Sequence, residues 1–133
     1  MNIKKYLNQV VKLNNTYFPN AKTTKKELLD ILDAHGRVFV KLKKDKVVGY
    51  LILRRKDEAY NVDFIGITRD CRRRGLASEL VRKAVTYAMR SGDGANFIFT
   101  YASIYNTISI NMLIKNGFTV ESINTRWINM KYG

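Results

Sequence analysis

The stretch from Phe64 to Leu80 constrains the fold more than any other part of the chain. It begins as an apolar run that ends near Ile67, passes through a polar and basic loop, and from Gly75 onward places apolar residues at helical spacing. This pattern predicts a strand, a loop and a helix in direct succession. Because the first N–H groups of a helix have no partner within it, a glycine and several arginines at such a helix start favour binding of a phosphate or pyrophosphate.

The glycine spacing in this stretch differs from that of the common nucleotide-binding loops. Neither G-x-x-x-x-G-K-(S/T) nor G-x-G-x-x-G occurs in the chain, so those two motifs give no support here. Directly after the predicted strand stands Arg72-x-x-Gly75-x-Ala77 instead. It resembles the Gln/Arg-x-x-Gly-x-Gly/Ala signature of the GNAT superfamily of acyl-CoA-dependent N-acyltransferases. In that family the loop cradles the pyrophosphate of coenzyme A.

A second stretch, Tyr105 to Phe118, resembles a later helix of the same family, which starts at an asparagine and ends on a Gly-Phe pair. Here these residues are Asn106, Gly117 and Phe118. Gly117 suits a left-handed helix C-terminus, and Phe118 suits the first buried position of the next strand. The two stretches follow each other in the family's order, and the resemblance covers roughly Val47 to Lys131.

The resemblance implies an α/β fold of the mixed α+β kind. We expect a GNAT-like domain with a central, twisted, mostly antiparallel sheet that contains one parallel strand pair and is flanked by about four helices. A chain of 133 residues with 46% hydrophobic and 26% charged residues suits one globular domain, 1–133, with a substantial core.

Periodicity and turn residues place the remaining elements. Thr24-x-x-Glu27 is a capping box that predicts the start of the second helix, and Gly36 predicts its end. The first strand of the family, which usually precedes these helices, has no counterpart here. The expected ranges are helices at 3–16, 24–36, 75–90 and from Asn106, strands at 38–42, 47–53, 60–67 and 96–101, a glycine-rich turn at 91–94, and a final antiparallel pair at 118–123 and 126–132.

Several residues are expected to bind acetyl-CoA because they match the family's positions. Backbone groups of Ile65, Gly66 and Ile67 would pair with the pantetheine arm as an added strand does. Asn106 would hydrogen-bond that arm, although an ordinary N-cap explains the same residue. The side chains of Arg73 and Arg74 either reach the adenosine phosphate or are simply solvated. The residues expected around the pyrophosphate, largely through main-chain N–H groups, are Arg72, Arg73, Arg74, Gly75, Leu76, Ala77 and Ser78.

The family's chemistry is direct attack of an amine on the thioester. Asp63 is the acidic residue of the strand that leads into the loop, and alternation would place it on one face with Ile65 and Ile67. It is the first candidate for the general base, and an ion pair with a nearby cation is the alternative. Many family members carry a general-acid tyrosine seven residues after the asparagine, where this chain has Leu113. Tyr101 and Tyr105 are the nearest substitutes, and a place in the core is the alternative for each.

Three further residues are given structural interpretations. His35 stands beside Gly36 and is expected to cap a helix C-terminus. Trp127 is expected in the core more than in an acceptor pocket. Cys71 lies among arginines, but the family uses no nucleophilic cysteine. With one histidine and one cysteine, no zinc site or other metal site is expected.

The net charge of +13 exceeds what coenzyme A alone would need and attracts anionic partners. One alternative function is therefore a GNAT-like modifier of nucleic acid, acting on a base amine, a tRNA or an aminoacyl-tRNA. Another is a non-catalytic module that keeps the coenzyme A groove and binds nucleic acid or protein. The acceptor amine is left open between a small molecule, a protein and a nucleic acid, and a homodimer is possible. No membrane span or signal segment is evident, and the single cysteine favours the cytoplasm.

Overall fold

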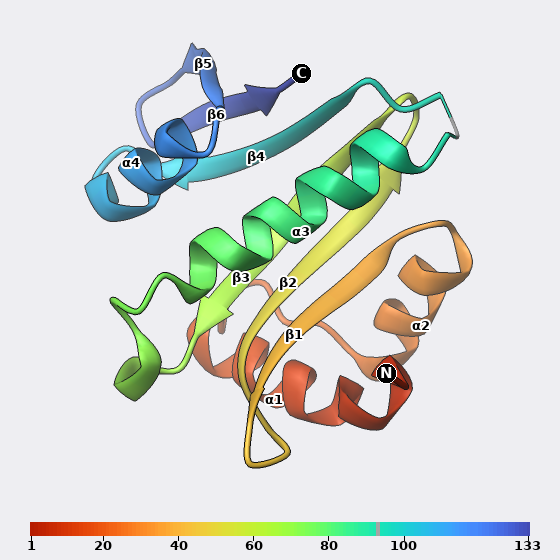
Figure 1. The fold of residues 1–133 in the computed structure, drawn as a ribbon. Coiled ribbons are helices and arrows are strands. Elements are labelled where there is room, and N and C mark those ends of the chain that lie inside the picture. The colour runs from red at the N-terminus through yellow and green to blue at the C-terminus, as the bar shows by residue number, and fades with distance from the viewer. Residues whose placement is uncertain (93) are drawn as a thin grey trace.

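The computed structural model describes residues 1–92 and 94–133 as one mixed sheet with helices on both of its faces (Figure 1). Among the described residues, no helix combines the length and the apolar character that a membrane crossing needs. The elements in chain order are η1 (Ile3–Tyr6), α1 (Leu7–Tyr17), α2 (Lys25–Asp33), β1 (Arg37–Lys43), β2 (Lys46–Lys56), β3 (Ala59–Ile67), η2 (Arg69–Cys71), α3 (Leu76–Arg90), β4 (Phe97–Ser103), α4 (Thr107–Lys115), β5 (Thr119–Ile123) and β6 (Trp127–Tyr132).

The six strands lie in the order β1-β2-β3-β4-β6-β5. Neighbouring strands are antiparallel except β3 and β4, which are parallel. The helix α3 makes the crossover between these two strands, as the predicted strand, loop and helix require. The mostly antiparallel sheet with one parallel pair is thereby confirmed. The final antiparallel pair is also confirmed, but β6 enters between β4 and β5, an order that strand patterns alone do not reveal.

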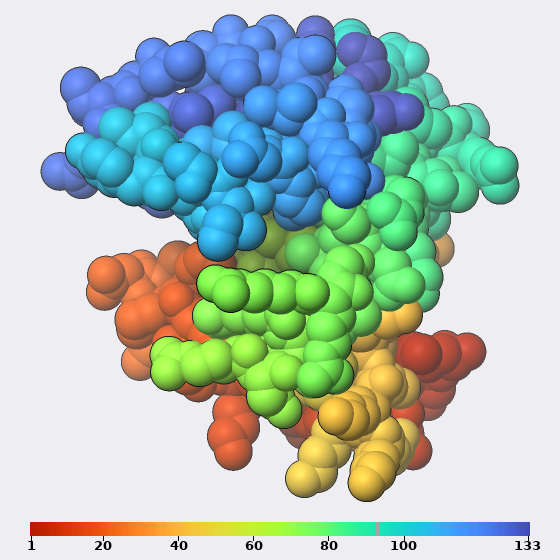
Figure 2. Space-filling model, turned by 60° about the vertical axis from the view of Figure 1, so that its left-hand side comes forward, coloured from red at the N-terminus to blue at the C-terminus, as the bar shows by residue number. Residues whose placement is uncertain are grey.

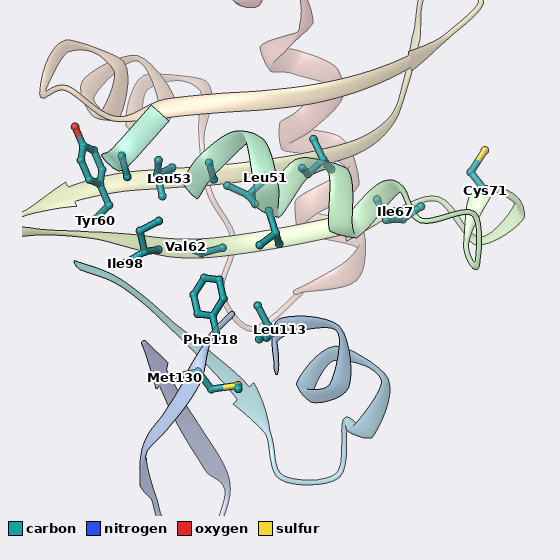
Figure 3. Packing of buried hydrophobic residues seen from close by; sticks show 14 residues of the cluster. Leu51, Leu53, Tyr60, Val62, Ile67, Cys71, Ile98, Leu113, Phe118 and Met130 are labelled. Carbon is teal, nitrogen blue, oxygen red and sulfur yellow. The ribbon is translucent and has the colours of Figure 1, made fainter. Parts of the chain in front are cut away.

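The sheet separates two hydrophobic clusters. One lies under α3 and α4 and contains Leu51, Val62, Leu80, Ile98 and Met130; the other lies under α1 and α2. Figure 3 shows how Leu113 and Phe118, from the C-terminal part of the chain, reach toward Val62 and Ile98. This shared cluster joins the two halves of the sheet, because burial of large apolar side chains stabilises by about 1.5–3 kcal/mol each.

The N-terminal helices follow the sequence prediction with two local differences. The first predicted helix begins as a 3-10 turn, η1, and continues as α1, which ends at Tyr17 before Pro19. Thr24 caps α2 by accepting a hydrogen bond from the Glu27 N–H. The helix ends at Asp33, and the residue with left-handed backbone is His35 at φ 68°, not Gly36. His35 thus occupies the C-terminal position that glycine usually takes.

The turns between the later elements confirm the sequence interpretation where they are described. Lys44 and Asp45 both have positive φ and join β1 to β2 as a hairpin. Gly117 has φ 93° at the end of α4, and Phe118, 2% exposed, donates its N–H to the Leu113 carbonyl. The glycine-rich turn predicted at 91–94 includes Asp93, which lies outside the described residues.

Candidate active site

The central feature of the site is the separation of β3 from β4. The two strands pair only from Ala59 opposite Phe97 to Asn61 opposite Phe99, although β3 continues to Ile67 and β4 to Ser103. Beyond the fork, β3 has a described strand partner only on its β2 side. Its backbone N–H and C=O groups on the other side therefore face a space that an extended ligand could enter.

A β-bulge at Asp63 marks the fork. Leu53 pairs with Val62 and the adjacent Ile52 pairs with Phe64, so Asp63 has no opposite residue on β2. A bulge bends its strand and interrupts the alternation of side chains. Val62, Ile65 and Ile67 consequently all belong to the α3 side of the sheet. Strict alternation would place Val62 on the opposite face from Ile65 and Ile67, and the bulge explains why it does not lie there.

Two adjoining hollows lie in the space beside the separated strands. The loop-side hollow, about 650 Å³, lies between β3, the start of α3 and α4, and the strand-side hollow, about 600 Å³, lies between β3, β4 and the end of α1. Figure 2 shows the hollowed surface between α4 and the β3–α3 loop. The residues that line both hollows are Phe18, Ile65, Asn106, Ser109 and Met112.

Gly66 lets β3 run close to a buried tyrosine behind the cleft. A Cβ atom at Gly66 would lie 2.6 Å from Cε1 of Tyr50. The Tyr50 hydroxyl donates a 2.8 Å hydrogen bond to Oδ1 of Asn14, and both residues are fully buried. Burial raises the pKa of Tyr50, so its hydroxyl stays neutral and holds α1 against this part of the sheet.

The β3–α3 loop has the backbone shape of an anion receptor. Arg73 has φ 65° and Gly75 has φ 77°, so two left-handed residues stand just before α3. Gly75 is the N-cap and offers no side chain to the first-turn N–H groups. Successive N–H groups in such a turn converge on one point and bind anions. No atom lies within 4 Å of a Cβ placed at Gly75, so glycine is needed there for its conformation and not for space.

The three loop arginines have different surroundings. Arg72 donates from Nε to the Ile67 carbonyl at 2.9 Å, and its guanidinium carbon lies 5.4 Å from the Tyr17 ring centre. Arg72 therefore braces the loop against the end of β3. Arg73 and Arg74 are exposed and form no ion pair with any described acidic residue, so both remain available to an anion.

A hydrogen bond across the cleft links α4 to the start of α3. The Asn116 side chain donates to Oγ of Ser78 at 2.9 Å and to the Met112 carbonyl at 2.8 Å. Because Ser78 accepts this bond, its own hydroxyl proton is free for a ligand oxygen in the loop-side hollow, which Ser78 lines. No sequence signal indicated this role of Asn116, because the contact joins residues that are distant along the chain.

Asn106 both caps a helix and lines the cleft. Its Oδ1 accepts a 3.1 Å hydrogen bond from the Ser109 N–H at the start of α4. The residue also lines both hollows. The N-cap interpretation is therefore confirmed, and the position is compatible with an additional ligand contact.

Asp63 lines the strand-side hollow and is also ion-paired. Its Oδ1 accepts a 2.7 Å hydrogen bond from Asn61, and Oδ2 lies 2.5 Å from Nη2 of Arg54. The Asp63 side chain is 11% exposed, whereas that of Arg54 is 53% exposed. The carboxylate is thus held at the fork by one neutral and one cationic partner. The ion pair with a nearby cation, the alternative given for Asp63, is therefore present, with Arg54 as the cation.

The aromatic residues around the hollow differ from expectation in their burial. Tyr101 is 58% exposed and lines the strand-side hollow, and Tyr105 is 85% exposed and lines neither hollow. The alternative of a core position was wrong for both. Trp127, expected in the core, is 48% exposed at the start of β6 and lines the strand-side hollow, because β6 reaches the surface there. Leu113 is buried in the cluster under α4.

The remaining candidates take structural positions. Cys71 is 2% exposed and unpaired. The His35 carbonyl accepts a hydrogen bond from the Tyr87 hydroxyl, away from both hollows. Within residues 1–92 and 94–133, no three of the histidine, cysteine, aspartate and glutamate side chains form a group that could hold a metal ion.

Sequence comparison decides the family. The profile of the acetyltransferase (GNAT) family matches residues 7–118. The chain belongs to the acetyltransferase (GNAT) family. Among curated proteins, no significant match to this GNAT chain was found.

Solved structures described as acetyltransferases share the fold at low sequence identity. YncA of Salmonella typhimurium, described as a putative acetyltransferase and solved with acetyl-CoA, has a TM-score of 0.80 and 16% identity, with 96% of this chain and 88% of that one covered. The ribosomal-protein-alanine N-acetyltransferase of Brucella melitensis has a TM-score of 0.79 and 14% identity, covering 96% and 94%. The PaiA N-acetyltransferase of Thermoplasma acidophilum, in complex with coenzyme A, has a TM-score of 0.77 and 12% identity, covering 97% and 93%.

The link between Asn116 and Ser78 is testable by a double-mutant cycle. Asn116→Ala should lower the free energy of unfolding by about 1–2 kcal/mol, because it removes two part-buried hydrogen bonds. Ser78→Ala should cost less, and the double variant should cost less than the sum, which urea denaturation would measure. Strict additivity of the two substitutions would show that the two side chains do not interact.

Proposed function

We propose that this protein transfers an acetyl group from acetyl-CoA to a primary amine by direct attack. The observation that carries the proposal is the continuity of the unpaired edge of β3 with the left-handed loop before α3. An extended amide-containing chain fits the first, and a diphosphate fits the second. Acetyl-CoA joins these two chemical parts in one molecule. Coenzyme A or acetyl-CoA in several neighbours of the same fold supports this assignment.

The residues proposed to hold the pantetheine arm are Ile65, Gly66 and Ile67. Their backbone lies beyond the fork and lines the loop-side hollow. The Ile67 carbonyl already accepts a bond from Arg72, so the remaining groups would do most of the pairing. Asn106 stands on the opposite wall of the hollow and would add a side-chain contact from α4.

The diphosphate would lie over the start of α3. Main-chain N–H groups between Arg72 and Ser78, with the positive end of the helix dipole, would stabilise its charge. The Ser78 hydroxyl, fixed by Asn116, would donate to one oxygen. Arg73 and Arg74, which have no described acidic partner, would reach the adenosine 3′-phosphate. Leu76 and Ala77 complete the wall of the hollow.

The thioester supplies an acyl carbon that a neutral amine can attack: the N–C bond forms, the C–S bond breaks, the amine loses a proton, and coenzyme A leaves as thiolate. Much of the acceleration would come from alignment of the two reactants. Asp63 is proposed to accept the proton, directly or through a water molecule. Among the described residues, it is the one that places a carboxylate in the lining of the strand-side hollow. Tyr101 lines the same hollow and is the better-placed hydroxyl for the leaving thiolate; the exposed Tyr105 would require movement of its segment.

The proposed cofactor site predicts a specific pattern of binding. Coenzyme A should bind by isothermal titration calorimetry and raise the melting temperature. The double variant Arg73→Ala with Arg74→Ala should weaken coenzyme A binding by about tenfold, because two exposed charge contacts are worth roughly 0.5–1 kcal/mol each. The same variant should bind 3′-dephospho-coenzyme A with nearly unchanged affinity, because this ligand lacks the phosphate that the two arginines would contact. The double variant Lys12→Ala with Lys115→Ala, which removes the same charge elsewhere, is the control. Absence of coenzyme A binding by the wild-type protein would refute the proposed function.

The role of Asp63 is tested separately from binding. With acetyl-CoA and a panel of amines that includes spermidine and a peptide with an N-terminal alanine, Asp63→Asn should lower kcat by about 10²–10⁴-fold and leave the coenzyme A affinity unchanged. Tyr101→Phe and Tyr105→Phe would separate the two tyrosines in the same assay. An unchanged kcat in Asp63→Asn would remove the general-base assignment. Tight coenzyme A binding without transfer to any amine would favour the non-catalytic module.

A further inference from the structure

A basic groove lies between the outer strand β1 and the helix α3, away from the cleft. Its hollow of about 480 Å³ is lined by Phe39, Lys41, Glu79, Arg82, Lys83, Thr86 and Tyr87. Glu79 is the one acidic residue among these, and its carboxylate lies 3.0 Å from Nζ of Lys41. Arg82 and Lys83 are exposed and pair with no acidic residue in the described part of the chain. The groove therefore carries uncompensated positive charge.

The cations around Glu79 act on its carboxylate. The hydrogen bond from Lys41 and its charge hold the pKa of Glu79 below the usual value, and the charges of Lys83 and Arg82 lower it further. Glu79 thus stays ionised as a single carboxylate beside three cations, Lys41, Arg82 and Lys83. The loop arginines belong to the proposed cofactor site. The cations of this groove are other residues and form a separate part of the +13 net charge.

The edge of the sheet runs along this groove. Within the described residues β1 pairs only with β2, and Figure 1 shows it as the outermost strand on its side of the sheet. Val38 and Val40 face the cluster under α1 and α2, and Phe39 packs on the α3 side. Alternation then places Arg37, Phe39 and Lys41 in one row beside α3. An added strand would meet a cation, an aromatic ring and a second cation in that order.

The aromatic rings of the groove are poorly arranged for nucleic acid. The Arg37 guanidinium carbon lies 4.7 Å from the Tyr87 ring centre, and the rings of Phe39 and Tyr60 meet Tyr87 edge-on at 6.2 and 5.7 Å. Single-stranded nucleic acid is usually held by open aromatic faces on which bases stack. Arg37 covers the Tyr87 face here, so the rings act as a packed floor.

A second copy of this chain is also a poor occupant. Pairing of β1 with another β1 would bring rows of Arg37, Lys41 and Lys43 together on one sheet face, and like charges in cross-strand positions are destabilising. A strand with acidic residues at alternate positions would instead be attracted to β1, because each carboxylate would lie beside a cation.

We propose that β1 and the groove beside α3 form a docking site for an extended acidic segment of a partner protein, which adds to the sheet as a strand. Its backbone pairs with the free edge of β1. Its side chains on the α3 side follow the order acidic, apolar, acidic, to match Arg37, Phe39 and Lys41. Arg82 and Lys83 on α3 bind further carboxylates of the same segment. This site is separate from the proposed acyl-transfer cleft.

The test uses a fluorescein-labelled peptide with the core Glu-Thr-Val-Thr-Glu, whose palindromic order suits either strand direction, and measures fluorescence anisotropy at low salt. Binding should be lost when glutamine replaces both glutamates. Arg82→Glu with Lys83→Glu should weaken it by about tenfold or more, whereas Lys12→Glu with Lys115→Glu, which changes the net charge equally on other surfaces, should have a much smaller effect.

Backbone pairing is tested with two N-methylated forms of the peptide. In an added strand every second N–H group points toward β1 and the others point away. Methylation of the N–H groups that face β1 should abolish binding, and methylation of those that face away should preserve it. Equal binding of both forms would contradict strand addition. Failure of the unmodified peptide to bind, or equally tight binding of an oligouridylate of matched charge, would overturn the proposal. Basic side chains would then serve only to protect the edge of β1 from pairing.

Discussion

The separation of β3 from β4 is the constraint on which the rest of the structure depends. Parallel strands that paired along their whole length would leave no backbone groups for a ligand and no space between α3 and α4. Here pairing stops at Asn61 and Phe99, and the bulge at Asp63 follows on β3 two residues later. The shared cluster around Val62, Ile98 and Phe118 holds the two halves together behind the fork. The cleft can therefore be open without dividing the core.

Several contacts fix the position of the cleft walls. Gly66 allows β3 to lie against Tyr50, whose bond to Asn14 secures α1 behind the sheet. Arg72 fastens the loop to the Ile67 carbonyl, and Asn116 fastens α4 to Ser78. Loop, strand and helix are thus braced by polar groups at the rim. Preorganisation of this kind lowers the entropic cost of binding.

The local features of the fold could be predicted from the sequence, and the long-range ones could not. The left-handed Gly117 and the Thr24 cap are encoded within a few residues, and each was found where the pattern placed it. The bulge at Asp63, the insertion of β6 between β4 and β5, and the exposure of Trp127 depend on pairing between distant segments. A single domain spanning 1–133 and a cytoplasmic location stay predictions from composition.

The most direct test of the central claim is amide hydrogen exchange with and without coenzyme A. Occupation of the free edge of β3 and of the loop should slow exchange at Ile65–Ile67 and at 72–78, with little change on the Val38–Leu42 edge, which lies outside the cleft. Binding of coenzyme A without protection of either segment would contradict the account, because the ligand would then lie somewhere other than between the separated strands.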